Sequence, residues 1–356
     1  MQRSPLNSWH YYLGRTAVTM YRETNEALFS KINALRFLAI LGVLFIHAEN
    51  TMQFSDLAIT FGYPVEREAI GAFEWAVPLF FLLSSYLFFR DFRWNQLLPK
   101  WSRRAHSLLI PYLVWNTIYF ALFALLPRLP LLAPYINSAP APLTLSTVLT
   151  AVFLHQYAGF LWFCKALILL TLLAPLFYLL FSRRYLAEAA LAVLFVFECF
   201  SPFDLPAVLS LNWRFVFFYG LGAYVGLRFP DAPRLTPPKF VCILLLCALP
   251  FVVALNVRYD SELYSLVFIV LLWFGLDAGV MRPYAAYQTS FFLYLTHILA
   301  FSLIKKFEFA LLPHTEAFML VSYFTVPLIA AALLVPLALF VKRIAPKTYA
   351  FLFGGR

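Results

Sequence analysis

Charged residues are scarce in this chain. Only 12% of its 356 residues are Asp, Glu, Lys or Arg, whereas 63% are hydrophobic and 19% are aromatic. Soluble globular proteins carry about 25% charged residues, so the composition excludes that class and predicts an integral membrane protein. The formal net charge is +10, but the basic residues lie in short loops between apolar runs. They therefore indicate how helices are oriented in a membrane, and they do not predict nucleic-acid binding.

The chain also lacks several motifs of binding and processing. Its four cysteines lie within apolar runs, without a Cys-x-x-Cys pair or a histidine at ligand spacing, so we expect neither a disulfide nor a metal site. No Gly-x-Ser-x-Gly turn surrounds Ser84 and Ser85, which argues against a serine acyl-enzyme. No small-residue cleavage site follows the first apolar run, so we expect the N-terminal segment to be retained.

Apolar runs dominate what is present. Ten of them are long enough to cross the hydrocarbon core of about 30 Å, and they predict an all-α, polytopic membrane protein with about ten transmembrane helices. The runs cover residues 34–50, 69–90, 107–126, 160–181, 186–201, 213–229, 239–257, 261–280, 289–310 and 317–342. We expect a cytoplasmic N-terminal segment at 1–31, interfacial or disordered, one transmembrane domain at 32–343, and a cytoplasmic tail at 344–356.

The basic residues in the loops predict the orientation of these helices. With the N-terminus in the cytoplasm, nineteen Lys and Arg residues fall in cytoplasmic loops and six in external loops, in agreement with the positive-inside rule. Both termini are then cytoplasmic. The short apolar segment 145–156 would reverse every later loop if it were a span, so we interpret it as an interfacial or re-entrant part of the longest external loop, 127–159.

Arg36 and His47 form the most informative pair of residues. Both lie in the first apolar run, where charged groups are costly. Eleven residues at 100° each bring their side chains within about 20° of one another, roughly 16 Å apart along the helix axis. One helix face therefore carries both. Taken alone, the pair fits two interpretations equally well. It is part of a functional site, or Arg36 snorkels to the headgroups and His47 caps the far end of the helix.

The sequence around this pair resembles a known family. The first apolar run contains NALRFLAILGVLFIHAEN, which resembles the Arg-x10-His signature of the membrane acyltransferase-3 family, whose members move acyl groups from acyl-CoA to sugars of surface polysaccharides and lipids. Four further stretches resemble family segments in the same order, so that the resemblance covers residues 34–305: VPLFFLLSSYLF, RRAHSLLIPYLVWN, LWFCKALILL and SFFLYLTHILA. The chain departs from the family pattern at Ser85, where Gly is usual, and at His106, where a basic residue is common.

The resemblance implies acyl transfer, with acetyl-CoA as the favoured donor, to a sugar hydroxyl of a cell-envelope or secreted glycan. In this interpretation His47 is the general base, because imidazole titrates near neutral pH. Glu74 is the candidate to orient the imidazole, and Lys165 is the candidate to stabilise the developing oxyanion. The alternative is a purely structural ion pair between Glu74 and Lys165.

The candidate donor site is basic. Arg36, Arg103 and Arg104 are predicted to bind the phosphates of CoA, because guanidinium groups match phosphate geometry. Plain positive-inside charge is the alternative for Arg103 and Arg104. The roughly 16 Å between Arg36 and His47 is of the order of an extended pantetheine arm. Phosphates held in the cytoplasm would then allow the thioester to reach the external layer, which predicts transfer across the membrane.

A substrate path is the third predicted feature. Tyr294 and His297 recur on one helical face with Ser290, and together with Trp162 they are predicted to line the path of the acyl group or the acceptor. The alternatives are a hydrogen-bonded core histidine for His297 and packing or interfacial anchoring for Trp162.

Two functional classes remain open at this point. The first is an enzyme, a carbohydrate O-acetyltransferase of the bacterial cytoplasmic (inner) membrane, whose partners are membrane lipid and a glycan or lipid-linked saccharide, without metal or nucleic acid. The second is a transporter or flippase for a lipid-linked glycan or small anionic metabolite, with Arg36 and Lys165 as binding charges and His47 as proton relay. Transporters often show inverted repeats and paired broken helices, which we do not find in the sequence. No oligomeric state is predicted.

Overall fold

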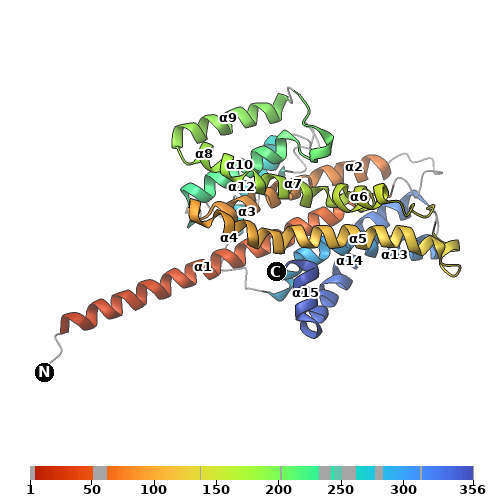
Figure 1. Ribbon diagram of the computed structural model, residues 1–356, viewed down its shortest axis with the longest axis horizontal. Helices are drawn as coiled ribbons and strands as arrows, with labels where there is room; N and C mark the ends of the chain where they lie inside the picture. The colour runs from red at the N-terminus through yellow and green to blue at the C-terminus, as the bar shows by residue number, and fades with distance from the viewer. Residues whose placement is uncertain are drawn as a thin grey trace.

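The structure is a computed structural model that describes residues 5–50, 62–136, 138–200, 203–231, 241, 243, 245–246, 248–249, 262–276, 284–312 and 315–355. Side chains are described from Asn25 onwards, except at positions 135 and 262. Over these residues every regular element is a helix, which confirms the predicted all-α class (Figure 1). The α-helices are α1 (Pro5–Ile46), α2 (Gly62–Ala72), α3 (Ala76–Phe89), α4 (Leu97–Arg104), α5 (Ile110–Leu125), α6 (Leu145–Leu154), α7 (Trp162–Leu172), α8 (Ala174–Phe181), α9 (Arg184–Phe200), α10 (Trp213–Arg228), α12 (Glu262–Gly275), α13 (Ser290–Leu311), α14 (Glu316–Ile344) and α15 (Pro346–Phe353).

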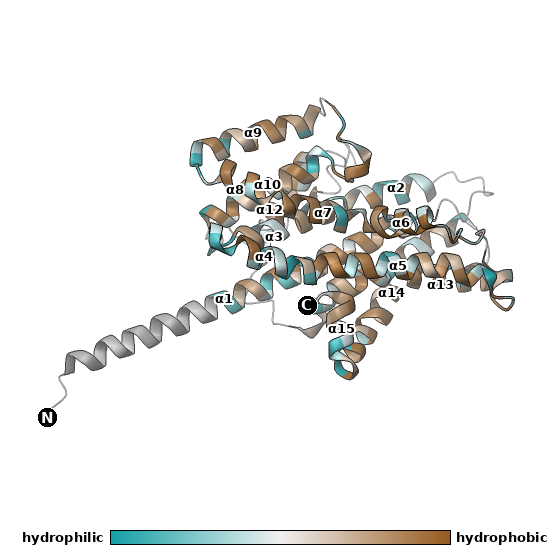
Figure 2. Ribbon diagram, in the orientation of Figure 1, coloured by the Kyte–Doolittle hydropathy of each residue, from teal (hydrophilic) through white to brown (hydrophobic). Residues whose placement is uncertain are grey.

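Several of these helices are suited to a bilayer. Five stretches are long and apolar enough to cross it: Asn25–Ile46, Gly62–Phe89, Trp94–Arg128, Ala285–Leu311 and Glu316–Ile344. A sixth arises if α6 and the stretch Gly159–Leu172, which meet at a bend of 53°, form one broken span. α14 shows why these helices belong in lipid, because large side chains such as Leu333 and Phe340 are each 59% exposed, and its surface is hydrophobic in Figure 2.

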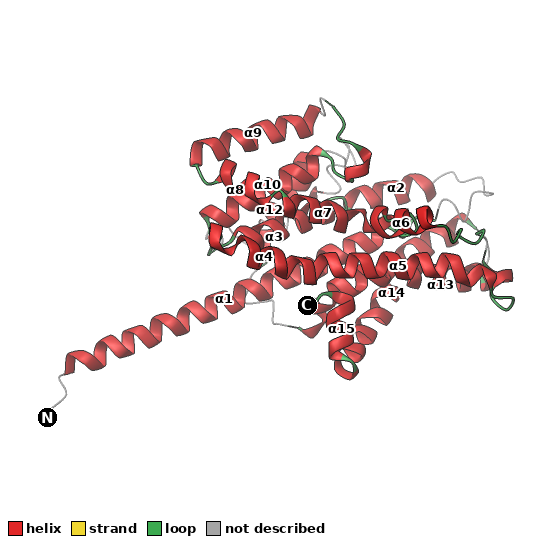
Figure 3. Cartoon of the chain, in the orientation of Figure 1, coloured by secondary structure: helices red, strands yellow, loops and turns green. Residues whose placement is uncertain are grey.

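The predicted count of ten spans is not reached in the part of the chain that the structure describes. Three of the predicted runs form helices of 17, 16 and 14 residues, namely α9, α10 and α12. The predicted run 239–257 lies largely outside the described residues. The segment that we expected to be interfacial or re-entrant contains α6, which lies along α5 and is joined to it by a hydrogen bond from the Tyr112 hydroxyl to Phe153 O, 2.9 Å. Figure 3, coloured by secondary structure, shows helices joined by loops and no strand among the described residues.

Helix α1 occupies the centre of the arrangement. It projects from the bundle at its N-terminal end and runs into it, where it contacts α3, α13 and α14 (Figure 1). The helix ends at Ile46 and not at residue 50, as the first apolar run had predicted. At this end Lys305 of α13 donates two hydrogen bonds, to Ala48 O at 2.8 Å and to Glu49 O at 2.7 Å. A cation here also complements the partial negative charge of a helix C-terminus.

Helices α3 and α10 pack closely against each other, and glycine makes this close approach possible. A Cβ atom added at Gly222 would lie 2.3 Å from Leu82 O, and one added at Gly226 would lie 2.7 Å from Tyr86 O. Small residues let helix backbones approach closely in membranes. The contact holds α3 in place beside α1, and both helices contribute to the site described next.

Candidate active site

A cavity of about 280 Å³ lies inside the bundle, and we call it the central cavity. Residues from α1, α3, α7 and α13 line it. Arg36 and His47 are both among them, which confirms that one face of α1 presents the two side chains. Eleven residues are about three turns, so the two residues lie roughly 16 Å apart along the helix axis.

Arg36 also borders a second cavity, of about 290 Å³, which we call the basic pocket. Lys100, Arg103 and Arg104 are part of its lining. The structure therefore brings the three predicted arginines together and adds Lys100, which sequence reasoning had counted only as a loop charge. The Arg104 guanidinium donates to Ser84 O at 2.8 Å, and Ser84 itself lines the central cavity. The two cavities thus share one wall and the Arg36 side chain.

A π-helix, Ala105–Leu109, separates α4 from α5 at this wall. Such wide turns are rare and are often found at functional sites. Here the turn directs neighbouring residues to different cavities, since Ser107 lines the basic pocket and Leu108 lines the central cavity. Sequence reasoning did not predict this π-helix.

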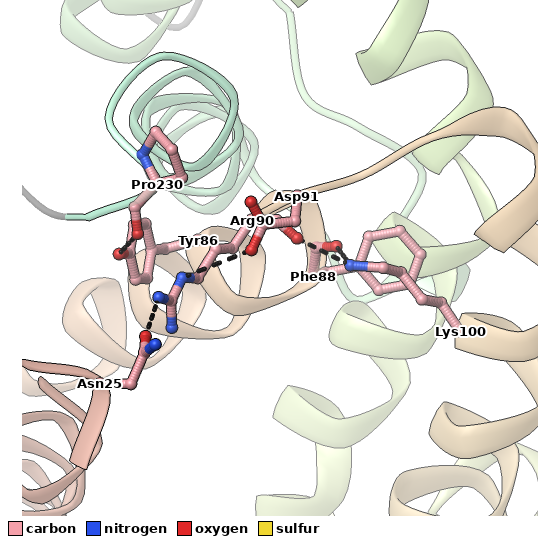
Figure 4. Close-up of polar contacts among 7 residues, drawn as sticks. All are labelled: Asn25, Tyr86, Phe88, Arg90, Asp91, Lys100 and Pro230. Carbon is pink, nitrogen blue, oxygen red and sulfur yellow. Dashed lines mark hydrogen bonds and ion pairs between the residues drawn. The ribbon is translucent and has the colours of Figure 1, made fainter. Parts of the chain in front are cut away.

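Hydrogen bonds fix the helix ends beside the basic pocket. Lys100 donates to Phe88 O and, at 3.0 Å, to Arg90 O, so that it caps the C-terminal end of α3 (Figure 4). Arg90 in turn donates to the Asn25 side chain of α1, and its Nε lies 3.8 Å from the Asp91 carboxylate. The contacts tie α1, α3 and α4 together at what we call the basic end of the bundle, the end that carries Arg90, Lys100, Arg103 and Arg104.

His297 of α13 lies beside His47 at the other end of the central cavity. The two ring centroids are 5.2 Å apart, and His297 is completely buried. Its Nδ1 is 2.7 Å from Tyr294 O. A carbonyl oxygen only accepts, so Nδ1 carries a proton, and in the neutral ring Nε2 is the basic nitrogen. This buried Nε2 has no hydrogen-bond partner among the residues that the structure describes.

Comparison with known proteins identifies the family of this chain. The acyltransferase-3 family model, described as an acyltransferase domain, matches residues 29–341. This chain belongs to the membrane acyltransferase-3 family. It is 27% identical over 361 residues to the succinoglycan biosynthesis protein ExoH of Rhizobium meliloti (strain 1021), a match that covers 92% of each chain. No solved structure matches the chain. The family assignment identifies the protein as an acyltransferase, and the central cavity carries both residues of the family's Arg-x10-His signature.

The remaining predicted path residues of this acyltransferase surround the central cavity. Trp162 and Tyr294 both line it. The Tyr294 hydroxyl donates to Phe160 O at 2.7 Å, in the break between α6 and α7, and Trp162 packs against Phe215 with ring centroids 4.9 Å apart. His297 does not line this cavity but contacts His47, which does.

Glu74 and Lys165 are placed differently from the predicted arrangement. Neither lines the central cavity, and the Glu74 carboxylate lies 3.4 Å from Arg214 Nη1 of α10. Arg214 also donates to Glu74 O and to the Ser265 hydroxyl. The expected contact of Glu74 with His47, and its alternative pairing with Lys165, are therefore replaced by an ion pair with Arg214. The cause is local, because Glu74 lies in a turn between α2 and α3 and not on a continuous second helix.

Sequence reasoning also missed the carboxylate that is buried nearest the end of α1. Glu66 of α2 is only 1% exposed, and it accepts a hydrogen bond from the Asn50 backbone N–H at 2.8 Å. The Asn50 side chain donates to Met319 O at 2.9 Å, so this group joins the end of α1 to α2 and α14. Its sequence signal was a glutamate just before the second apolar run. Among the described residues, no group of three or more His, Cys, Asp or Glu could hold a metal ion.

Proposed function

We propose that this acyltransferase moves an acetyl group from acetyl-CoA to a sugar hydroxyl of a cell-envelope or secreted polysaccharide. The observation that carries the proposal is that Arg36 and His47 line one cavity, with Arg36 also bordering the basic pocket. The similarity to ExoH, which is named as a succinoglycan biosynthesis protein, supports a polysaccharide acceptor.

The basic pocket is the proposed site of the CoA phosphates. Four cationic side chains line it, and hydrogen bonds between cationic groups and phosphate are about twice as strong as neutral ones. Arg36 belongs to both cavities, so a CoA molecule held there by its phosphates would extend its pantetheine arm along α1. The roughly 16 Å rise from Arg36 to His47 suits that arm, and Trp162 and Tyr294 would flank it.

His47 is the proposed general base of the reaction. It takes the proton of the sugar hydroxyl as the hydroxyl oxygen attacks the thioester carbonyl carbon. The bond from this carbon to sulfur then breaks, and the imidazolium returns the proton to the leaving thiolate. The products are the sugar ester and free CoA. His297 is proposed as a positioning residue, because its ring lies beside the His47 ring in a buried site with a fixed tautomer.

The orientation in the membrane belongs to the same proposal. We place the basic end in the cytoplasm of a bacterial cell, where acetyl-CoA is made, and the His47 end on the external side. Nineteen basic residues in cytoplasmic loops against six in external loops support this placement. The proposal includes ten spans in the bacterial inner membrane, with both termini in the cytoplasm.

Mass spectrometry of the surface and secreted glycans tests the function directly. Cells without the gene should lose one acetyl group per modified sugar unit, and the wild-type gene should restore it. The His47→Ala variant, expressed at the wild-type level, should not restore it. Unchanged glycans in the deletion strain would refute the proposed function. Acetylated glycans found only on untranslocated precursors in the cytoplasm would refute transfer across the membrane.

A further inference from the structure

A third cavity, of about 280 Å³, lies between the end of α1 and helix α13. We call it the α1–α13 pocket. His47 is the one residue that lines both this pocket and the central cavity. The two cavities therefore adjoin at His47, with the proposed donor arm in the central cavity and the α1–α13 pocket next to it.

The structure at the end of α1 explains this position. The His47 N–H still bonds to Val43 O at 3.1 Å, but the chain has left the helical course by Glu49, and Glu49 lines the same pocket as His47. On an unbroken helix, residues two apart would point in different directions. Lys305 holds this turn through its hydrogen bonds to Ala48 O and Glu49 O.

The lining of the α1–α13 pocket is suited to a sugar. Glu49 offers carboxylate oxygens that accept hydrogen bonds from hydroxyl groups, and Lys305 offers a donor. The Ser302 hydroxyl donates to Ile298 O at 2.8 Å, so its oxygen is available as an acceptor. Phe301 adds an aromatic surface. The volume is at the lower limit of small-molecule sites, about 300 Å³, which fits one sugar unit with the remaining glycan outside.

We propose that the α1–α13 pocket is the acceptor subsite, where one sugar unit of the glycan presents its hydroxyl to His47. This proposal rests on the acetyl transfer proposed above and adds the place and the residues of acceptor binding. The sugar hydroxyl and the thioester carbonyl then meet beside the His47 ring, where the two cavities adjoin. The hydroxyl proton moves to His47 from the α1–α13 pocket and leaves toward the CoA sulfur in the central cavity, so acetyl passes directly from donor to acceptor without an acyl-enzyme.

A cysteine at position 302 provides the test, because chemical modification blocks the pocket after the protein has folded. Cells that carry only the Ser302→Cys variant are treated with a charged, membrane-impermeant methanethiosulfonate. Their own glycans serve as acceptors, and labelled acetate that enters glycan esters is measured. We expect modification to lower acetylation about 10-fold or more, since small misplacements of a substrate have large effects on rate. A thiol reductant should restore acetylation.

Leu303→Cys is the matched control. It is the next residue on α13, is 62% exposed and does not line the pocket, so its modification should leave acetylation unchanged. Wild-type cells treated in the same way report on the native cysteines. Acetyl-CoA affinity of the purified, modified Ser302→Cys protein should equal that of the unmodified protein, because position 302 lines neither the central cavity nor the basic pocket.

The outcomes separate this proposal from the function on which it rests. Undiminished acetylation by a modified Ser302→Cys protein, with the adduct confirmed by mass spectrometry, would overturn the acceptor subsite. So would a cysteine that the reagent never reaches, or a loss of acetyl-CoA binding equal to the loss of transfer. If wild-type cells incorporate no acetyl group into glycan, the proposed function itself fails before the pocket is tested.

Discussion

His47 and His297 face each other across α1 and α13 with their ring centroids 5.2 Å apart and their planes inclined by 42°. The hydrogen bond from His297 Nδ1 to Tyr294 O leaves the basic Nε2 on the buried side of the ring. Phe160 and Phe301 pack against the His297 ring at 5.3 and 5.7 Å between centroids. His47 thus lines two cavities, whereas His297 beside it is buried between aromatic rings.

The first prediction concerns His297. Replacing it by Phe keeps an aromatic ring of similar size among its aromatic neighbours but removes the buried basic nitrogen Nε2 from the ring beside His47. We expect acetyl transfer to fall about 10- to 100-fold, at the lower end of effects on general base catalysis. Acetyl-CoA affinity should not change. The pH profile of transfer should also shift, because the surroundings of the base change, and a purely structural role would leave that profile in place.

The second prediction concerns His47 itself. His47→Ala removes the proposed base from the wall between two cavities, where it fills little of the hydrophobic core. Transfer should fall by about 10²- to 10⁴-fold, the range for loss of a general base, with acetyl-CoA binding retained. Single-turnover transfer and ligand affinity are measured on the same purified sample. A variant that transfers acetyl groups at the wild-type rate would remove His47 from the mechanism.

The third prediction concerns Arg36. Arg36→Ala should weaken acetyl-CoA binding about 10-fold or more, since a hydrogen bond to a charged group contributes about 1.5–3 kcal/mol. Arg36→Lys should recover only part of the affinity, because an ammonium group lacks the bidentate fork. Isothermal titration of the detergent-purified protein gives the dissociation constants. Arg93→Ala is the matched control, since Arg93 is exposed near the same end of the bundle but does not line the basic pocket.

The sequence predicted the shared face of Arg36 and His47 but not the partner of Glu74, and the difference has a physical basis. Arg36 and His47 lie on one helix, whose periodicity fixes their relative direction, and the spacing alone predicted their shared face. Glu74 was predicted to orient His47 on the condition that the first two helices touch. A turn before α3 brings Glu74 instead to Arg214, 140 positions away, and contacts at such separations depend on how helices pack. The end of α1 and its cap by Lys305 were not predictable for the same reason.

The fourth prediction concerns helix packing. Gly222→Ala places a methyl group 2.3 Å from the Leu82 carbonyl oxygen, so α3 and α10 must move apart. We expect a clear fall in melting temperature and reduced yield of folded protein, as in other overpacked interiors, where the cost is about 1–3 kcal/mol. Gly159→Ala is the control, because nothing lies within 4 Å of the Cβ that it would add. Equal thermal stability of the two variants would contradict the close approach of α3 and α10.

The last prediction concerns sidedness, on which the cross-membrane mechanism depends. Asn95 lies in the segment that joins α3 and α4 at the basic end, and Ala139 lies in the loop between α5 and α6. Both residues are exposed. A membrane-impermeant thiol reagent applied to intact cells should label Ala139→Cys and should leave Asn95→Cys unlabelled until the membrane is opened. Reversed labelling would place the basic pocket outside, where acetyl-CoA is not supplied, and the proposed route of the donor would be wrong. Labelling of both sites in sealed cells would show that they share one face, and α5 could not then cross the membrane as the proposal requires.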